Sequence, residues 1–145
     1  MTRLHRLDHV AVAVHDTDQA LEYFRDRLGL PMVWSERNEL VGARLTYLDA
    51  GNIMVQLVEP LDASSPVATH LATEGEGLHH LCFAVDDVPG TAAALADPDA
   101  PSVLLGSGRG RPSAFVPGGL HHGVRVECTA SDPPEVALAT SEGPT

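Results

Sequence analysis

The first third of the chain alternates apolar and polar residues in a pattern that predicts one strand, one helix and three more strands. Residues 7–14 predict a strand, and residues 18–28 place their apolar side chains on one helical face. An acidic segment at 16–18 supplies an N-cap for that helix, and Gly29 ends it. Apolar and β-branched runs predict the strands that follow, at 31–37, 42–49 and 52–58.

A similar order of elements is predicted for the rest of the chain. After a short helical segment at 64–74, the patterns indicate a strand at 78–85, a helix at 88–96, and shorter strands at 101–105, 112–116 and 123–128. We therefore expect an α+β fold. Residues 1–130 would form one domain of two βαβββ modules, at about 5–60 and 76–129, and the proline-containing residues 131–145 a flexible tail.

The two modules repeat a short motif at a fixed distance. Leu7-Asp8-His9-Val10 and Leu78-His79-His80-Leu81 each carry a histidine at the third position, and His9 and His80 are 71 residues apart. Gln56 and Glu127, each a polar residue within an apolar strand, are also 71 residues apart. The shared distance predicts a duplicated unit of about 71 residues.

These four residues form a candidate metal site. His9 shares its strand face with Ala11 and Ala13, whose small side chains leave room for a ligand. If the two modules pack about a pseudo-twofold axis, two imidazoles, one amide oxygen and one carboxylate converge on a concave sheet surface. Such a set suits a divalent first-row metal with positions left open for water or substrate.

Each residue taken alone has a simpler interpretation. His9 would be a hydrogen-bonded structural histidine, and Gln56 or Glu127 a polar residue on a solvated strand face. The equal spacing in both modules favours the shared site. It also selects His80 over His79, which aligns with Asp8 and is expected to face the opposite side of its strand. The pair His121-His122 lies in a predicted turn and is either an exposed loop or a border of the site.

Composition narrows the possible partners. The net charge is −11, and all nine basic residues are arginines, which argues against nucleic acid or an anionic membrane as a partner. No apolar run approaches the roughly 20 residues that cross a bilayer, and the N-terminus has no signal-type apolar core, so we expect a cytoplasmic location. Cys82 and Cys128 lie within predicted strands and are expected to be buried reduced thiols.

Several segments resemble the vicinal oxygen chelate superfamily and, within it, most of all the methylmalonyl-CoA epimerases. They include Leu7-Asp8-His9-Val10, Val55-Gln56-Leu57-Val58-Glu59-Pro60, Gly77-Leu78-His79-His80 and Gly123-Val124-Arg125-Val126-Glu127. The resemblance covers residues 5–129. It implies paired βαβββ modules that form a cupped mixed sheet, and frequently a homodimer. It also implies one divalent metal ion, cobalt first, with nickel, zinc, manganese and iron as alternatives.

The resemblance further implies a reaction. A malonyl-type acyl thioester would lose its α-proton, and the metal would stabilise the enolate. Glu127 would be both ligand and catalytic base, and Arg109 and Arg111 would bind the coenzyme A phosphates in a chain without lysine. The epimerases also carry a second glutamate near the third strand. Leu45 stands at the position we assign to it, and Glu39 lies before that strand.

Two other functions remain open at this stage. One keeps the fold and the metal but changes the chemistry to that of a glyoxalase-like isomerase, a lyase or a tailoring enzyme of secondary metabolism, which a single base would permit. The other is a metal-free protein that binds small molecules between its modules. The four matched ligands count against this second possibility.

Overall fold

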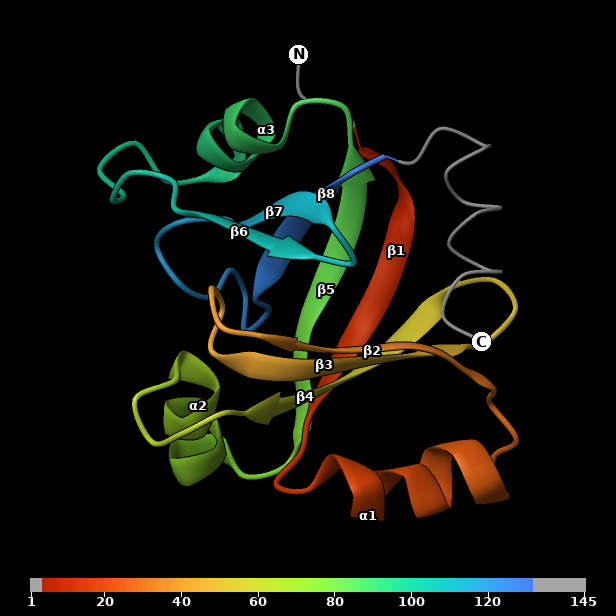
Figure 1. Ribbon diagram of the computed structural model, residues 1–145. Helices are drawn as coiled ribbons and strands as arrows, with labels where there is room; N and C mark the ends of the chain where they lie inside the picture. The colour runs from red at the N-terminus through yellow and green to blue at the C-terminus, as the bar shows by residue number, and fades with distance from the viewer. Residues whose placement is uncertain (1–3, 132–145) are drawn as a thin grey trace.

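The computed structural model of the protein describes residues 4–131. An eight-stranded mixed sheet in the order β2-β3-β4-β1-β5-β8-β7-β6 curves into a cup (Figure 1). The predicted α+β architecture of two βαβββ modules is thereby confirmed. The first module contains β1 (Leu4–Ala13), α1 (Thr17–Leu21), a π-helical continuation (Glu22–Arg27), β2 (Met32–Asn38), β3 (Ala43–Asp49) and β4 (Met54–Pro60).

The second module follows a connecting helix, α2 (Pro66–Glu74). It contains β5 (Gly77–Val85), α3 (Val88–Leu95), β6 (Leu105–Gly108), β7 (Arg111–Phe115) and β8 (Val126–Ala130). Residues 132–145 of the predicted tail lie outside the described part of the chain. None of the helices within residues 4–131 is long and apolar enough to span a bilayer.

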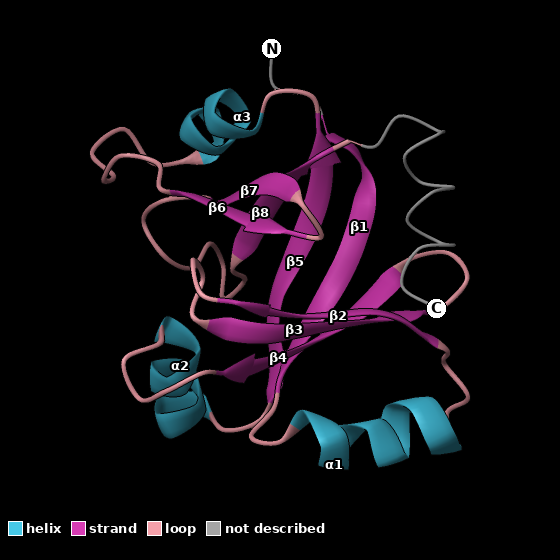
Figure 2. Ribbon diagram, viewed as in Figure 1, coloured by secondary structure: helices cyan, strands magenta, loops and turns pink. Residues whose placement is uncertain are grey.

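Local chemistry explains where the helices begin. The Asp16 carboxylate accepts a hydrogen bond from the Gln19 backbone N–H at 3.0 Å, and the Asp87 carboxylate caps Gly90 in the same way, also at 3.0 Å. The two caps are 71 residues apart, as in the sequence repeat. Figure 2 shows the helices around the periphery of the sheet, where α1 and α3 bury apolar side chains such as Leu21 and Ala92 against it.

The two modules are related by a pseudo-twofold axis between the central strands. β1 and β5 are antiparallel, with Val10 opposite Leu81, and the flanking pairs His9–Cys82 and Ala11–His80 are repeats of each other. β4 lies parallel to β1, and β8 lies parallel to β5. This arrangement brings the strands of both sequence motifs to the middle of the cup.

The register of β1 and β5 shifts beside each of the two histidines. Leu7 lies opposite Phe83 and His9 opposite Cys82, so Asp8 is an extra residue in β1. The pairing on the other side skips His79 in the same manner. A β-bulge of this kind interrupts the strict alternation of side chains between the two faces.

The two edge strands approach each other and narrow the cup. The Asn38 side-chain amide of β2 donates to the Ser107 carbonyl of β6 at 2.9 Å, and the Arg109 backbone N–H donates to a Glu36 carboxylate oxygen at 2.8 Å. Gly108 lies at this contact, where a Cβ atom would be 2.7 Å from the Tyr47 hydroxyl. The close approach therefore requires glycine.

Most strand boundaries differ from the prediction by one to three residues, and two of the differences lie near the site. β6 covers residues 105–108, whereas we expected 101–105, and β8 begins at Val126 rather than at residue 123. Arg109 and Gly110, with φ of 55° and 75°, form the two-residue turn between β6 and β7. Gly106 and Gly108 are typical of a loop in sequence, but in the structure they belong to β6 and lie where it approaches the first module. Both cysteines are buried free thiols, as predicted.

Candidate metal and catalytic site

Three of the four predicted ligands converge at the pseudo-twofold axis. The His80 Nε2 and Glu127 Oε1 atoms are 3.0 Å apart, the two histidine Nε2 atoms are 3.3 Å apart, and His9 Nε2 lies 3.4 Å from Glu127 Oε1. Donor atoms bound about 2.1 Å from a common cation are separated by roughly 3.0–3.4 Å. His9 and His80 are buried, and the Glu127 side chain is only 12% exposed. The cluster has the spacing of a metal site.

Gln56, the fourth predicted ligand, lines the same cavity and is itself buried. Its amide nitrogen donates to the Tyr47 hydroxyl at 2.8 Å, whereas its Oε1 atom has no hydrogen-bond partner among the described residues. A buried acceptor without a partner is costly. A cation beside His9, His80 and Glu127 would satisfy this oxygen, so the donor set fits a divalent metal ion.

Asp8 fixes the orientation of His9. Its carboxylate accepts a hydrogen bond from His9 Nδ1 at 2.8 Å, which leaves Nε2 directed to the cluster. Asp8 is 3% exposed and also pairs with Arg109 at 2.5 Å and with Arg111 at 3.7 Å. The role of Asp8 is not predictable from strand alternation, which places its side chain on the face opposite to that of His9.

The expectation that His79 faces away from His80 is wrong. The Nδ1 atoms of the two rings are 2.7 Å apart, and both residues line the cavity. The β-bulge at His79 is the physical reason, since the extra residue changes the direction of its side chain. His79 is the second-module equivalent of Asp8, and its ring hydrogen-bonds to the Nδ1 atom of His80 as Asp8 does to that of His9.

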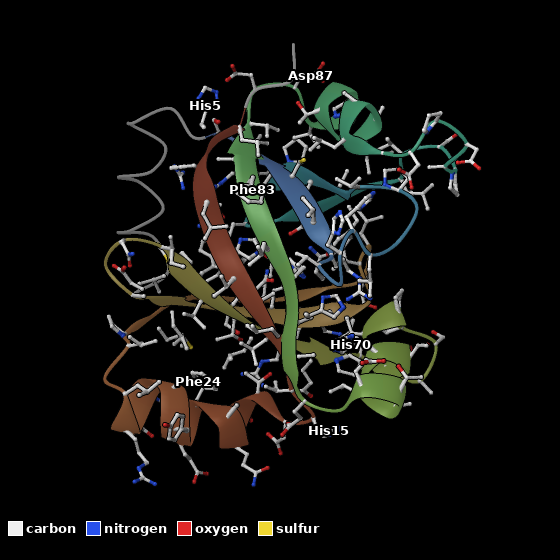
Figure 3. The ribbon with its side chains drawn as sticks, turned by 180° about the vertical axis from the view of Figure 1, so that it is seen from behind. His5, His15, Phe24, His70, Phe83 and Asp87 are labelled. Atoms are coloured by element: carbon white, nitrogen blue, oxygen red, sulfur yellow. The ribbon has the colours of Figure 1, made fainter. Side chains whose placement is uncertain are left out.

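The other histidines lie away from the cluster or only border it. Figure 3 shows His5 and His15 at opposite ends of β1, and His70 on α2 beside β5. The His70 ring packs against His79 with centroids 4.7 Å apart. His121 and His122 form a turn before β8 and do not line the cavity.

Electrostatics favour the ionised carboxylates of the site. Burial alone would raise the pKa of the Glu127 carboxyl, but the His80 and His9 rings lower it on balance. Burial likewise opposes the ionised form of Asp8, yet its hydrogen bond to His9 and the nearby Arg109 hold the pKa low. Glu127 is therefore ionised at neutral pH, as a metal ligand must be.

The histidines respond to burial in different ways. Burial would lower the pKa of His9, but Asp8 and Glu127 raise it above the ordinary value. Burial lowers the pKa of His80. Burial, together with the charges of His80 and Arg125, lowers the pKa of His79 to about 3. His79 is thus a neutral ring at physiological pH.

The cluster opens into a cavity of about 370 Å³ between the two modules. Its walls are mostly apolar, with Leu45, Val58 and Val67 from one half facing Phe115 and Val116 from the other. Leu45 pairs with Val58 in the first module, and Ser113 pairs with Thr129 at the equivalent place in the second. A small acyl group therefore fits beside the cluster.

The two arginines predicted to bind phosphates both lie against Asp8. Arg109 lines the cavity and stacks over the Tyr47 ring at 4.4 Å, and Arg111 is buried. Their charges are engaged by a buried carboxylate, and their role toward coenzyme A stays a prediction. Arg125, for which the sequence carries no signal of a role, also lines the cavity and donates to the His79 carbonyl at 3.0 Å.

This combination of a two-module cup and a His–His–Glu cluster defines a protein of the vicinal oxygen chelate type. The family model of the glyoxalase/bleomycin resistance protein/dioxygenase superfamily matches residues 8–116. The chain belongs to this superfamily.

Several known relatives of the chain are named as acyl-CoA epimerases. It is 30% identical to the ethylmalonyl-CoA/methylmalonyl-CoA epimerase of Cereibacter sphaeroides over 118 residues, 77% of this chain and 87% of that protein. The match to the mitochondrial methylmalonyl-CoA epimerase of Mus musculus is 35% identical over 101 residues and covers 66% of this chain. It spans only about half of that protein, 52%.

A solved structure has the same fold. A variant of the Streptomyces coelicolor methylmalonyl-CoA epimerase, in complex with 2-nitronate-propionyl-CoA, has a TM-score of 0.75 and 33% identity and covers 90% of this chain and 100% of its own. Solved variants of that enzyme change one glutamate to glutamine or leucine, and a glutamine 17 positions later to alanine. Glu39 and Gln56 of this chain are also 17 positions apart.

Proposed function

We propose that the protein is a metal-dependent epimerase of a methylmalonyl-CoA-like acyl thioester. The observation that carries the proposal is the buried cluster of His9, His80 and Glu127 beside the unpartnered Gln56 oxygen, in a cavity sized for a small acyl group. The similarity to acyl-CoA epimerases supports the substrate class.

These residues would hold one divalent ion, with cobalt as the first candidate. When bound, the ion supplies Lewis acidity that stabilises negative charge on a carbonyl oxygen. The Glu127 carboxylate, ionised and directed into the cavity, accepts the α-proton on one face of the substrate. The apolar walls exclude water and thereby strengthen these interactions.

Glu39 is our candidate for the proton-transfer group on the other face. Glu39 precedes Gln56 by 17 positions in the sequence, the same separation as between the changed glutamate and glutamine of the Streptomyces coelicolor enzyme. This equal separation favours Glu39 over the Leu45 position. Glu39 is exposed in the β2–β3 turn, paired with Arg37, and lies two residues before the cavity-lining Val41. The role requires its side chain to turn from Arg37 toward the cavity.

The test follows the α-proton of (2R)- and (2S)-methylmalonyl-CoA in deuterated buffer with cobalt-loaded protein. We expect interconversion and α-deuteration for the wild type, and loss of interconversion for both Glu127→Gln and Glu39→Gln. Glu39→Gln should still exchange the α-proton of the enantiomer that Glu127 deprotonates. Glu22→Gln, an exposed change on the π-helical segment, is the control.

Absence of interconversion and exchange in the metal-loaded wild type would refute the epimerase. Exchange without interconversion would instead identify a one-base enzyme. That outcome corresponds to a glyoxalase-like isomerase, which is favoured by the pairing of Glu39 with Arg37 outside the cavity lining.

A further inference from the structure

Arg125 is held in place by the turn that precedes it. His122 and Gly123 have φ of 53° and 82°, the pattern of a two-residue type I′ turn, and His121 and Val124 exchange backbone hydrogen bonds of 2.8 and 3.0 Å. The Arg125 carbonyl accepts from the Leu81 backbone N–H at 3.0 Å, and its guanidinium donates to the His79 carbonyl at 3.0 Å. Hydrogen bonds to β5 therefore fix both the backbone and the guanidinium of Arg125.

The guanidinium of Arg125 is the cavity charge that the described residues leave uncompensated. Arg109, the other arginine in the cavity wall, is paired with Asp8, and Glu127 is paired with two histidines. The Arg125 side chain donates to a neutral carbonyl, and the guanidinium forms no ion pair with any residue between 4 and 131. Only one of its donors is used there, and a guanidinium has five.

The position of Arg125 places this charge next to the reacting centre. Arg125 lies just before β8, where its carbonyl continues the hydrogen bonding to β5, and it is two residues before Glu127. At strand spacing their Cα atoms are about 7 Å apart. Both line the cavity, and Arg125 also contacts the backbone of His79, which adjoins the cluster. An anion bound by Arg125 therefore lies within a few bonds of the atom that Glu127 deprotonates.

We infer that Arg125 binds the free carboxylate of the substrate acyl chain. The cavity would then select thioesters of dicarboxylic acids over neutral acyl thioesters. Planar guanidinium and carboxylate groups form two parallel hydrogen bonds, which gives this recognition its geometry. The inference rests on the proposed function for the thioester, but the carboxylate subsite itself can be tested without it.

The experiment compares ligands with and without the carboxylate. Dissociation constants are measured by calorimetry on metal-loaded protein for methylmalonyl-CoA, for propionyl-CoA, which lacks the carboxylate, and for free methylmalonate. The variants are Arg125→Gln, Arg125→Lys and, as a matched control, Arg27→Gln on the exposed side of the π-helical segment. Metal content and far-UV circular dichroism establish that each variant is folded and loaded.

Arg125→Gln should weaken methylmalonyl-CoA and methylmalonate about 10–100-fold and change propionyl-CoA less than about 3-fold. Arg125→Lys should restore part of the loss, and Arg27→Gln should behave as wild type. In the exchange assay, KM should rise more than kcat falls, because the contact exists before and during proton transfer.

An unchanged preference for the carboxylated ligands in Arg125→Gln would overturn the inference. Equal weakening of all coenzyme A ligands would also overturn it, since Arg125 would then contact the coenzyme A phosphates. Failure of the wild type to exchange the α-proton refutes the proposed function alone. In that case, loss of free methylmalonate binding in Arg125→Gln would still support the subsite, and its retention would refute it.

Discussion

The buried carboxylate of Asp8 links the metal donors to the arginines behind them. It orients His9 through Nδ1 and at the same time compensates Arg109 and Arg111, so one side chain serves both the site and the core. Carboxylates that orient a ligating histidine in this way change metal affinity when they are lost. Replacing Asp8 with a neutral side chain of the same shape tests both its effect on metal binding and its effect on stability.

We predict that Asp8→Asn lowers metal affinity about 10–100-fold. The amide cannot stabilise the His9 ring as a carboxylate does, and it removes the negative charge beside the buried Arg109 and Arg111 guanidinium groups. The unfolding free energy should therefore also fall by about 3 kcal/mol. Chelator competition measures the affinity, and urea unfolding measures the stability. Asp86→Asn, which changes an exposed partner of His5, should change neither the metal affinity nor the unfolding free energy. Equal metal affinity in Asp8→Asn and wild type would contradict the orienting role.

His79 should make the metal-free protein sensitive to mild acid. Its pKa is about 3 in the folded state and 6.5 in the unfolded chain, so between these values the unfolded chain binds more protons. The unfolding free energy therefore decreases as pH falls below 6.5, by at most about 1.4 kcal/mol per pH unit from this residue. Above pH 6.5 the effect vanishes.

The measurement is urea unfolding at pH 7.5 and 5.0 with a chelator present. Wild type should lose about 1–2 kcal/mol more than His79→Gln between these two pH values, because the variant has no ring to protonate. His15→Gln, at an exposed position, should lose as much as wild type. If His79→Gln has the same pH dependence as wild type, the ring is not held neutral in the folded protein.

The sequence could predict the four candidate ligands but not the residues that orient them. The 71-residue offset is unaffected by the β-bulges because each module has a bulge at the equivalent position. The structure brings His9, His80 and Glu127 together. Asp8 and His79 were missed because the bulge that turns them inward depends on pairing between β1 and β5. Such pairing joins residues about 70 positions apart and leaves no local signal.

At the scale of the elements, the β6–β7 hairpin was the least predictable part of the fold. Its strand contains Gly106, Ser107 and Gly108, which have low strand propensity, and its turn is Arg109-Gly110 rather than a pair with Asn or Asp. These residues are explained by a tertiary contact, since the hairpin lies against Val41 and Tyr47 of the other module. The tight packing against the first module therefore outweighs the low strand propensity of these glycines.

We predict that Gly108→Val weakens both the fold and the site. The new Cβ atom would overlap the Tyr47 hydroxyl at 2.7 Å, and overpacking of this kind costs about 1–3 kcal/mol. Displacement of Tyr47 would also break the hydrogen bond that the Gln56 amide nitrogen donates to its hydroxyl. The Gln56 amide would then lose its orientation, and metal affinity should fall. Thermal unfolding and chelator competition measure the two effects. Leu104→Ala, an exposed change just before the same hairpin, should leave both unchanged.

At the scale of the whole molecule, the candidate ligands make the two modules depend on each other. His9 and Gln56 come from the first module and His80 and Glu127 from the second, and the central strands that carry the histidines pair directly. A ligand that binds only the folded state stabilises all the parts that hold it. Metal bound here would therefore stabilise both modules, including parts far from the site.

Trp34, the single tryptophan, lies on β2 in the first module and reports on that coupling. Cobalt at 100 times its dissociation constant should raise the unfolding free energy by about 2.7 kcal/mol, and a chelator should abolish the increase. The tryptophan fluorescence and circular dichroism transitions should shift together. His80→Ala changes only the second module, yet it should remove the metal-induced shift seen at Trp34, whereas exposed His15→Ala should retain it. A metal-induced shift that persists at Trp34 in His80→Ala would mean that the first module binds the ion alone.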